Sequence, residues 1–133
     1  MAQQNTALVL IGLQELWRDK NSDYRLRNMD PLIDRACYLI QYAREMWYKI
    51  IFIRHTEKEW PFADKDPLSQ IIEDLCPQPE DIIIKKTKIS SFYKARLEEE
   101  LQWIKNIVVA WIPTNLCVRM FVEEAYDREF NLA

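Results

Sequence analysis

The residue best placed for covalent chemistry is Cys117, which follows an apolar run at residues 107–112 and precedes a segment with helical spacing. In the first turn of a helix, unpaired backbone N–H groups and the helix dipole both favour a thiolate. Cys117 is therefore a candidate nucleophile, and the alternative is a small buried hydrophobe. Cys37 and Cys76 have no comparable setting, and we interpret them as structural.

Two other features can assist such a nucleophile. Lys86 ends a β-branched run, so its ammonium group can stabilise a thiolate or an oxyanion if that strand end lies near Cys117. The alternative is a solvated surface lysine. The Ile112–Pro113 bond is a candidate cis peptide, which costs about 0.5 to 1 kcal/mol before proline and aims neighbouring N–H groups into a site. The alternative, an ordinary trans proline in a loop, is favoured by the sequence alone.

The histidine and cysteine content argues against a metal site. His55 is the only histidine, and the three cysteines include no C-x-x-C pair, so the usual zinc motifs are missing from the sequence. We expect no metal and no cofactor, and His55 is interpreted as a hydrogen-bonded residue at the rim of a site. The odd number of cysteines suits a reducing compartment and predicts a cytoplasmic location.

The composition excludes several classes of function. The 133 residues are 49% hydrophobic and 12% aromatic, which is enough for one packed core and argues against disorder. The charges nearly cancel to a net −3, so no basic surplus is available for nucleic acid. The apolar runs are shorter than a membrane span, and the start has no charged signal region. We expect a soluble single domain over residues 1–133 that binds neither nucleic acid nor membranes.

The elements that must position Cys117 and Lys86 follow from the pattern of apolar residues. Four runs with consecutive apolar positions predict strands buried on both faces. Asp30 and Asp66, each followed by proline, predict the N-caps of two helices. The strands are expected at residues 8–11, 50–53, 82–84 and 107–110, and the helices at 30–46, 66–75, 97–104 and from about 115 to 125.

Alternating strands and helices predict a parallel, Rossmann-like sheet with helices on both faces, a three-layer α/β/α sandwich. The site of such a fold lies beyond the carboxyl ends of the strands. Those ends carry Gly12 to Gln14, Arg54 with His55, Lys85 with Lys86, and residues 112–117. Lys85 is expected to point away from the site. The candidate pocket aromatics, each of which can equally be a core residue, are Trp17, Trp60, Phe62 and Phe92.

Several stretches together resemble the isochorismatase-like cysteine hydrolases: A-L-V-L-I-G-L-Q at 7–14, I-F-I-R-H at 51–55, K-T-K-I-S-S-F at 86–92, V-A-W-I-P-T-N-L-C-V-R at 109–119 and A-Y-D-R at 125–128. Members of this family commonly hydrolyse C–N bonds of small amides with a cysteine, a lysine and an aspartate, and have a cis peptide before the nucleophile. The resemblance implies that Cys117 and Lys86 are catalytic. It also implies an oxyanion hole around Ile112, Pro113 and Cys117, and substrate contacts from Gln14, His55, Phe92 and Asn115.

The chain departs from this family in its first-strand carboxylate and in its length. Gly12 stands at the position of the aspartate, so the group that accepts the thiol proton is missing and an impairment of about 10²- to 10⁴-fold is expected. Family members continue past residues 125–128 into two further strands. The domain is therefore expected to lack its C-terminal strands, to expose its fourth strand and to form homo-oligomers.

A third departure is the scarcity of glycine. Trp47, Trp103 and Trp111 stand where the family usually turns on glycine, and Glu129 replaces another. Glycine at such turns allows positive φ or close approach of two backbones. Four explanations stay open: a UGA codon that means glycine but was read as tryptophan, deliberate redesign, drift in a pseudoenzyme, or three unrelated packing tryptophans.

These observations predict a hydrolase that acts on a small amide or a related substrate through a thioester on Cys117, impaired by the loss of the aspartate. The alternative is a non-catalytic pseudoenzyme, fragment or redesigned scaffold that acts by self-association.

Overall fold

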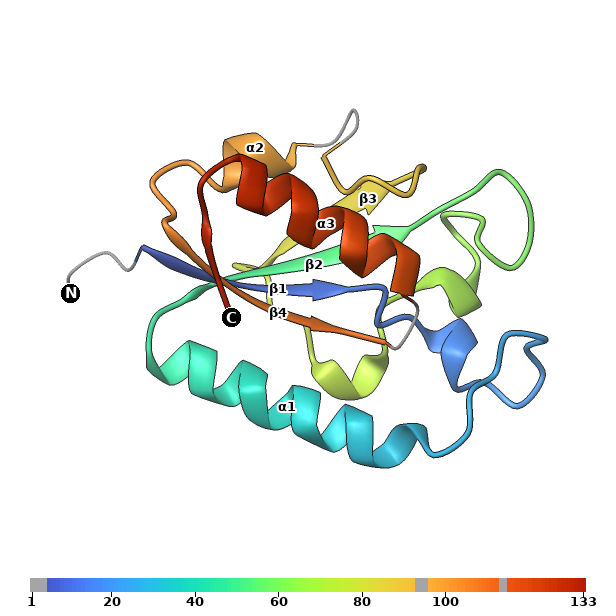
Figure 1. Ribbon diagram of the computed structural model, residues 1–133. Coiled ribbons are helices and arrows are strands. Elements are labelled where there is room, and N and C mark those ends of the chain that lie inside the picture. Colours follow the sequence, from blue (N-terminus) through green and yellow to red (C-terminus); the bar gives the residue numbers. More distant parts are fainter. Residues whose placement is uncertain (1–4, 93–95, 113–114) are drawn as a thin grey trace.

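A five-stranded parallel sheet with the strand order β3-β2-β1-β4-β5 forms the middle of the molecule (Figure 1). The computed structural model describes residues 5–92, 96–112 and 115–133, with the backbone alone for 115–117. The strands are β1 (Thr6–Ile11), β2 (Lys49–His55), β3 (Ile82–Lys86), β4 (Asn106–Trp111) and β5 (Asn131–Leu132). The helices are α1 (Met29–Glu45), α2 (Leu97–Glu100) and α3 (Asn115–Asp127), with 3₁₀ turns η1 (Glu15–Trp17), η2 (Pro67–Ser69) and η3 (Glu73–Leu75).

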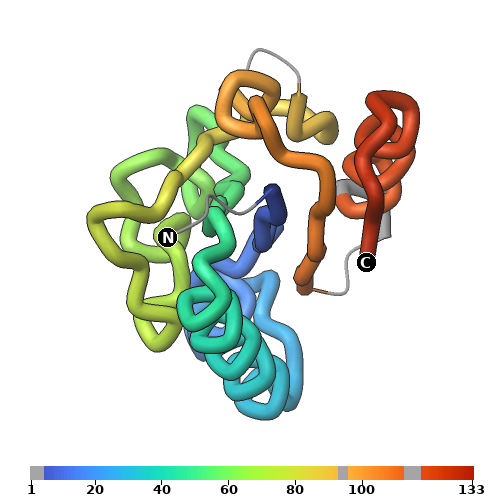
Figure 2. Tube along the Cα trace, turned by 90° about the vertical axis from the view of Figure 1, so that its left-hand side faces the viewer, coloured from blue at the N-terminus to red at the C-terminus, as the bar shows by residue number. Residues whose placement is uncertain are grey.

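Helices cover both faces of the sheet, which confirms the three-layer prediction. Figure 2 looks onto the amino ends of the strands and shows α1 on one side of the sheet, with α2 and α3 on the other. Side chains alternate along each strand, so Leu8 and Phe52 pack toward α1, whereas Val9 and Ile53 pack toward Phe121 of α3. No helix in the described part of the chain is long and apolar enough to cross a membrane.

The two central strands and the outer strands differ in burial. Every residue of β1 is buried, as the apolar run predicts, and so are the five inner residues of β2. The prediction of two buried faces is wrong for β3, where Ile83 is 41% exposed, and for β4, where Val108, Val109 and Ala110 are only partly buried. The central strands have helices or strands against every side, whereas β3 is at the edge of the sheet.

The edge of β4 is only partly open. β5 pairs with Asn106 and Ile107, and the backbone oxygen of Ala133 accepts a hydrogen bond from Val109 N at 2.9 Å. The prediction of a wholly exposed fourth strand is therefore wrong for the amino half of β4, because the chain returns after α3 and adds a short parallel strand there.

The ends of the helices differ from the predicted ones. α1 begins with Asn28 at the N-cap position and not with Asp30, whose carboxylate lies in the first turn near the positive end of the helix dipole. The buried side chain of Met29 fixes this earlier start. The helix predicted from residue 97 to 104 is reduced to the short α2.

The second predicted helix is replaced by η2 and η3. Asp66 does act as an N-cap, since its carboxylate accepts a hydrogen bond from Leu68 N at 2.9 Å. Beyond η2 the backbone pairs with the loop after β1: Gln70 O accepts from Glu15 N at 2.9 Å, and Ile72 N donates to Leu13 O at 3.0 Å. These long-range hydrogen bonds use backbone groups that a continuous helix would need, so tertiary pairing overrides the local pattern.

The turns that lead into β2, β4 and β5 contain residues with positive φ, a conformation that favours glycine. The φ angles are 61° at Trp47, 70° at Trp103 and 66° at Glu129, whereas Trp111 lies within β4 and is not among the positive-φ residues. Hydrogen bonds from Tyr48 N to Ala43 O and from Phe130 N to Ala125 O close the ends of α1 and α3 in the manner of Schellman caps. The left-handed positions are therefore a requirement of how these helices end.

Candidate active site

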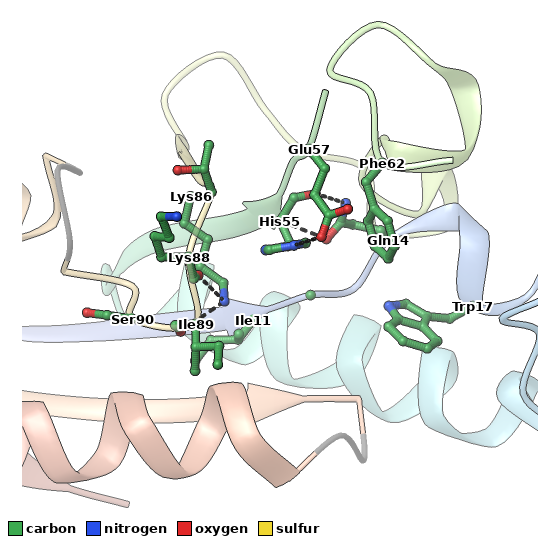
Figure 3. A pocket seen from close by; sticks show the side chains of 12 residues that line it. Ile11, Gln14, Trp17, His55, Glu57, Phe62, Lys86, Lys88, Ile89 and Ser90 are labelled. Atoms are coloured by element: carbon green, nitrogen blue, oxygen red, sulfur yellow. Dashed lines mark hydrogen bonds and ion pairs between the residues drawn. The ribbon is translucent and has the colours of Figure 1, made fainter. Parts of the chain in front are cut away.

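A cavity of about 800 Å³ opens at the carboxyl ends of β1, β2 and β3 (Figure 3). This is the edge of the sheet at which the strand order and parallel direction place a site. It is lined by Ile11, Gly12, Gln14, Trp17, His55, Glu57, Phe62, Lys86, Thr87, Lys88, Ile89 and Ser90.

Lys86 extends into this cavity from the end of β3. Its side chain is only 2% exposed, and Nζ donates hydrogen bonds to the backbone oxygens of Lys88 at 3.2 Å and Ile89 at 3.1 Å. Among the described residues no carboxylate forms an ion pair with it. Lys85 points away, as expected, and its Nζ lies 2.8 Å from Asp64 Oδ2. The result is a buried ammonium group whose positive charge is not neutralised by a described side chain.

The start of α3 lies on the same face of the sheet as Lys86 and His55. His55 of β2 and Lys86 of β3 are partners in the register of the two strands. Ile53 and Ile84 lie two residues before them, on the same face of the sheet, and pack toward α3. The backbone of Cys117 is in the first turn of α3, as predicted. The side chains of Cys117 and Asn115 and the Ile112–Pro113 bond lie outside the described residues, whereas Ile112 itself is buried.

Gly12 lies between these groups, at the end of β1. Its φ is 71°, and a Cβ atom built onto it meets no other atom within 4 Å. Gly12 N donates to Ile53 O at 2.9 Å, which fixes the backbone beside β2. The cavity therefore has room for a side chain at the position where the sequence resemblance implies an aspartate, and the backbone conformation is one that Asp and Asn tolerate better than other residues.

The side-chain amide of Gln14 connects three backbone segments. Nε2 donates to His55 O at 2.9 Å and to Ser69 O at 2.7 Å, while Oε1 accepts from His55 N at 2.9 Å. Gln14 is 1% exposed. These contacts show a residue that holds the ends of β1 and β2 and the turn at Ser69 together, with its amide engaged by the backbone.

His55 reaches the rim of the cavity, where Nε2 lies 2.9 Å from Glu57 Oε1. Nδ1 is buried and has no hydrogen-bond partner within the part of the chain that the structure describes. Its ring contacts Phe62 edge-on at 5.2 Å between centroids. The exposed Glu57 was not identified from the sequence, where no local pattern marks it.

The candidate aromatic residues separate into two groups. Trp17 and Phe62 line the cavity. Phe92 does not: it stacks on Phe121 at 5.7 Å, and the guanidinium carbon of Arg128 lies 4.2 Å from its ring centroid. Trp60 is exposed and is not a lining residue.

A buried polar network behind the cavity escaped the sequence analysis. Arg54 donates to Ser69 O at 3.0 Å and to Asp64 Oδ1 at 3.1 Å. The hydrogen bond from Lys85, followed by that from Arg54, holds the pKa of Asp64 below its usual range. The network fastens residues 56–70, the loop that carries Glu57 and Phe62. The available signal was an arginine at the end of the apolar run at 50–53.

The described cysteines are not in the cavity. Cys37 Sγ donates to Asp74 O at 3.3 Å, and burial, reinforced by the negative charge of Asp74, raises the pKa of the Cys37 thiol. Cys76 is exposed. Within residues 5–92, 96–112 and 118–133, no group of three or more His, Cys, Asp or Glu side chains is arranged to hold a metal ion.

Sequence comparison identifies relatives of this chain. A family model described as the isochorismatase domain matches residues 6–133. Ureidoacrylate amidohydrolase RutB of Agrobacterium fabrum is 36% identical over 62 residues, which are 45% of this chain and 27% of that protein. The match thus spans about a quarter of the length of that relative.

Structural comparison finds the same fold in solved structures. A cysteine hydrolase from Pseudomonas syringae has a TM-score of 0.87 at 23% identity, covering 96% of this chain and 68% of that chain. N-carbamoylsarcosine amidase from Thermoplasma acidophilum has a TM-score of 0.85 at 18% identity, covering 97% of this chain and 80% of that chain. At these identities the comparison shows a shared fold.

Proposed function

Because the chain belongs to the isochorismatase family, we propose that it hydrolyses the C–N bond of a small amide through a thioester on Cys117. The observation that carries the proposal is the buried Lys86 ammonium group, which faces a cavity on the side of the sheet where α3 begins. Similarity to two proteins named as an amidohydrolase and an amidase supports the reaction class.

In the first step, the Cys117 thiolate attacks the amide carbonyl carbon and forms a C–S bond. The positive charge of Lys86 and the N-terminal end of α3 favour the thiolate over the thiol. Backbone N–H groups at the start of α3 stabilise the oxyanion of the tetrahedral intermediate. The C–N bond then breaks, and the leaving amine takes its proton from a water molecule in the cavity, which leaves a hydroxide ion.

In the second step, this hydroxide attacks the thioester, the C–S bond breaks, and the carboxylic acid and the Cys117 thiolate are released. Gly12 supplies no carboxylate to deliver a proton to the leaving amine, so this proton comes from water. Proton transfer is therefore the impaired part of this reaction, at a cost of about 10²- to 10⁴-fold in rate.

The proposal is tested by the pH dependence of iodoacetamide alkylation at each cysteine, assigned by peptide mapping. We expect Cys117 to react well below the ordinary thiol pKa of about 8.5, because the thiolate is the reactive form. Cys37 serves as the slow internal control because burial raises the pKa of its thiol, and exposed Cys76 controls for access. If Cys117 reacts no faster than Cys76 below pH 8, the nucleophile assignment fails.

Self-association without catalysis is a second candidate function, favoured by the end of β4. Within the described residues, no strand pairs with Trp111 on the side of β4 away from β1, and its side chain is exposed. An open strand edge with an exposed aromatic residue can pair with a second copy. Size-exclusion chromatography of the wild-type chain and of Trp111→Lys tests this: a dimer that Trp111→Lys converts to monomer supports it, and a wild-type monomer argues against it.

A further inference from the structure

The imidazole of His55 is held in place by contacts that leave one ring nitrogen without a partner. The backbone N and O of His55 bind the side-chain amide of Gln14, and Nε2 lies 2.9 Å from Glu57 Oε1 (Figure 3). The ring of Phe62 meets the imidazole edge-to-face. Nδ1 is buried and has no hydrogen-bond partner within the described part of the chain. A buried polar atom without a partner is unfavourable, so its presence points to a ligand or a reaction that uses it.

The contact with Glu57 determines which nitrogen of the neutral ring carries the hydrogen. A carboxylate accepts hydrogen bonds and donates none, so Nε2 carries the hydrogen and Nδ1 presents a lone pair. When Nδ1 takes up a second proton, the negative charge of Glu57 stabilises the imidazolium against the positive charge of Lys86, the register partner of His55. A base that a third group orients in this way can activate a nucleophile.

The imidazole lies on the face of the sheet that α3 covers (Figure 1). Ile53, two residues before His55, packs in the same cluster as Phe121 of α3, and residues two positions apart in a strand share a face. β2 lies between β1, which leads into Gly12, and β3, which ends at Lys86. His55 is therefore a potential base between the buried ammonium group and the position that lacks a carboxylate, and all three residues line one cavity.

We propose that His55 is the proton carrier of this site: Nδ1 takes the proton of the Cys117 thiol and delivers it to the leaving amine, while Glu57 is the positioning residue that orients the ring. This inference rests on the proposed amide hydrolysis and adds a catalytic residue to it. His55 recovers part of the rate that the missing carboxylate at Gly12 costs.

The proton moves as follows. Its transfer from the Cys117 thiol to Nδ1 gives a thiolate and an imidazolium, and the thiolate forms the C–S bond. As the C–N bond breaks, the imidazolium gives the Nδ1 proton to the amine, in place of a water molecule. A second water then adds its hydroxyl group to the thioester carbon and its proton to Nδ1. The C–S bond breaks, which releases the carboxylic acid and restores the thiolate and the imidazolium.

Nitrogen NMR tests the link between His55 and Cys117 without any substrate. His55 is the only histidine, so a chain with ¹⁵N-labelled histidine gives ring signals from this residue alone, and their chemical shifts report which nitrogens carry hydrogen. At pH 7 we expect hydrogen on both nitrogens of the wild type, and on Nε2 alone in Cys117→Ser, which has no thiol proton to transfer. Cys37→Ser is the control, because Cys37 binds Asp74 O outside the cavity. Identical spectra of the wild type and Cys117→Ser overturn the proposal.

The role of Glu57 is tested in the Cys117→Ser chain, where the ring is expected to be neutral. A glutamine amide donates as well as accepts, so Glu57→Gln is expected to give a mixture of hydrogen on Nδ1 and on Nε2. Glu59→Gln, at an exposed position in the same loop, is the matched control and keeps the hydrogen on Nε2. A ring that stays protonated on Nε2 alone in Glu57→Gln contradicts the positioning role.

Turnover tests delivery of the proton to the leaving group. Acetanilide and 4-nitrophenyl acetate carry the same acyl group, but aniline needs a proton to leave and 4-nitrophenolate does not. We expect His55→Gln to lower kcat/KM for acetanilide by about 10²-fold, and to lower it less for the ester. The loss on acetanilide is expected to shrink in the Gly12→Asp background, where the aspartate is a second carrier. Equal losses on both substrates, or equal losses in both backgrounds, indicate a structural role and contradict proton delivery.

The two measurements separate this proposal from the proposed function. A spectrum that responds to Cys117→Ser, without acetanilide hydrolysis by the wild type or Gly12→Asp, contradicts amide hydrolysis and leaves the His55–Cys117 pair intact. Acetanilide hydrolysis with a spectrum that does not respond supports the hydrolase function and contradicts the role of His55.

Discussion

Residues with positive φ lie at both ends of the sheet, but they differ in residue type and in their surroundings. At the carboxyl end, the single glycine of the chain, Gly12, has φ 71° and faces a cavity in which a side chain has room. At the amino end, the turns before β2, β4 and β5 have similar φ angles but carry Trp47, Trp103 and Glu129. Substitutions at the carboxyl end are therefore expected to change reactivity, and substitutions at the amino end are expected to change the stability of the fold.

The largest effect is expected from Gly12→Asp. The added carboxylate supplies the missing proton carrier and raises kcat/KM for small amides by about 10²- to 10⁴-fold. Gly12→Asp is expected to lower the midpoint of urea unfolding, because φ 71° strains any side chain by up to about 1 kcal/mol even though no atom lies within 4 Å of the new Cβ. Gly12→Asn is the matched control, with the same shape and no ionisable group. An equal gain in both variants contradicts a proton-transfer role.

The next largest effect is also expected at the carboxyl end of the sheet, at Lys86. Lys86→Met removes the buried positive charge, raises the pKa of the Cys117 thiol and slows its alkylation at pH 7 by about tenfold for each unit of that rise. Lys85→Met is the control, because the exposed Lys85 is paired with Asp64 on the other face. Unchanged alkylation in Lys86→Met shows that Lys86 does not act on the thiol.

Stability measurements test the amino end. Trp47→Gly and Trp103→Gly each relieve a left-handed residue, and Trp103 is 82% exposed, so little burial is lost. We expect each to stabilise the fold by about 1 kcal/mol, or roughly 3 to 5 °C in Tm. Trp111→Gly is the control. The same substitution inside β4 is expected to destabilise the fold, because glycine weakens a strand. Destabilisation by all three variants shows that the tryptophans are packing residues.

The codons at these positions decide between the explanations for the tryptophans. If UGA stands for glycine in the source organism, all three of Trp47, Trp103 and Trp111 are encoded by UGA. A UGG codon at any of them argues for redesign, drift or ordinary packing tryptophans.

The smallest effect concerns acid stability at η3. The hydrogen bond from Arg18, at 3.0 Å, holds the pKa of Asp74 below its ordinary value of 3.8. A carboxyl whose pKa is lower in the folded state stabilises the fold above its unfolded pKa, and this stability is lost as the pH falls through the folded pKa. Asp74→Asn is therefore expected to lose less urea resistance than the wild type between pH 5 and pH 2. Parallel losses in both proteins contradict a role for this carboxylate.

The sequence predicts what depends on local pattern. The apolar runs at β1 and β2 and the spacing of Ile33, Ala36, Ile40 and Ala43 in α1 identify the layers and the edge of the sheet that holds Lys86. It does not predict features that depend on contacts between distant segments. Examples are the split of the helix predicted at 66–75, which is caused by pairing with residues 13–15, and the use of the Gln14 amide by the backbone.

The amide of Gln14 fixes both the N–H and the C=O of His55 and the oxygen of Ser69 in the absence of any ligand. The rim of the cavity is therefore rigid before a substrate arrives, and little conformational entropy remains to be lost on binding. In hydrogen-exchange terms, the His55 amide is expected to be protected as strongly as the amides of the sheet interior, although it lies at the edge of an open cavity. Substrates then bind to a preformed surface, and the association rate is governed by diffusion into the cavity and not by rearrangement of its walls.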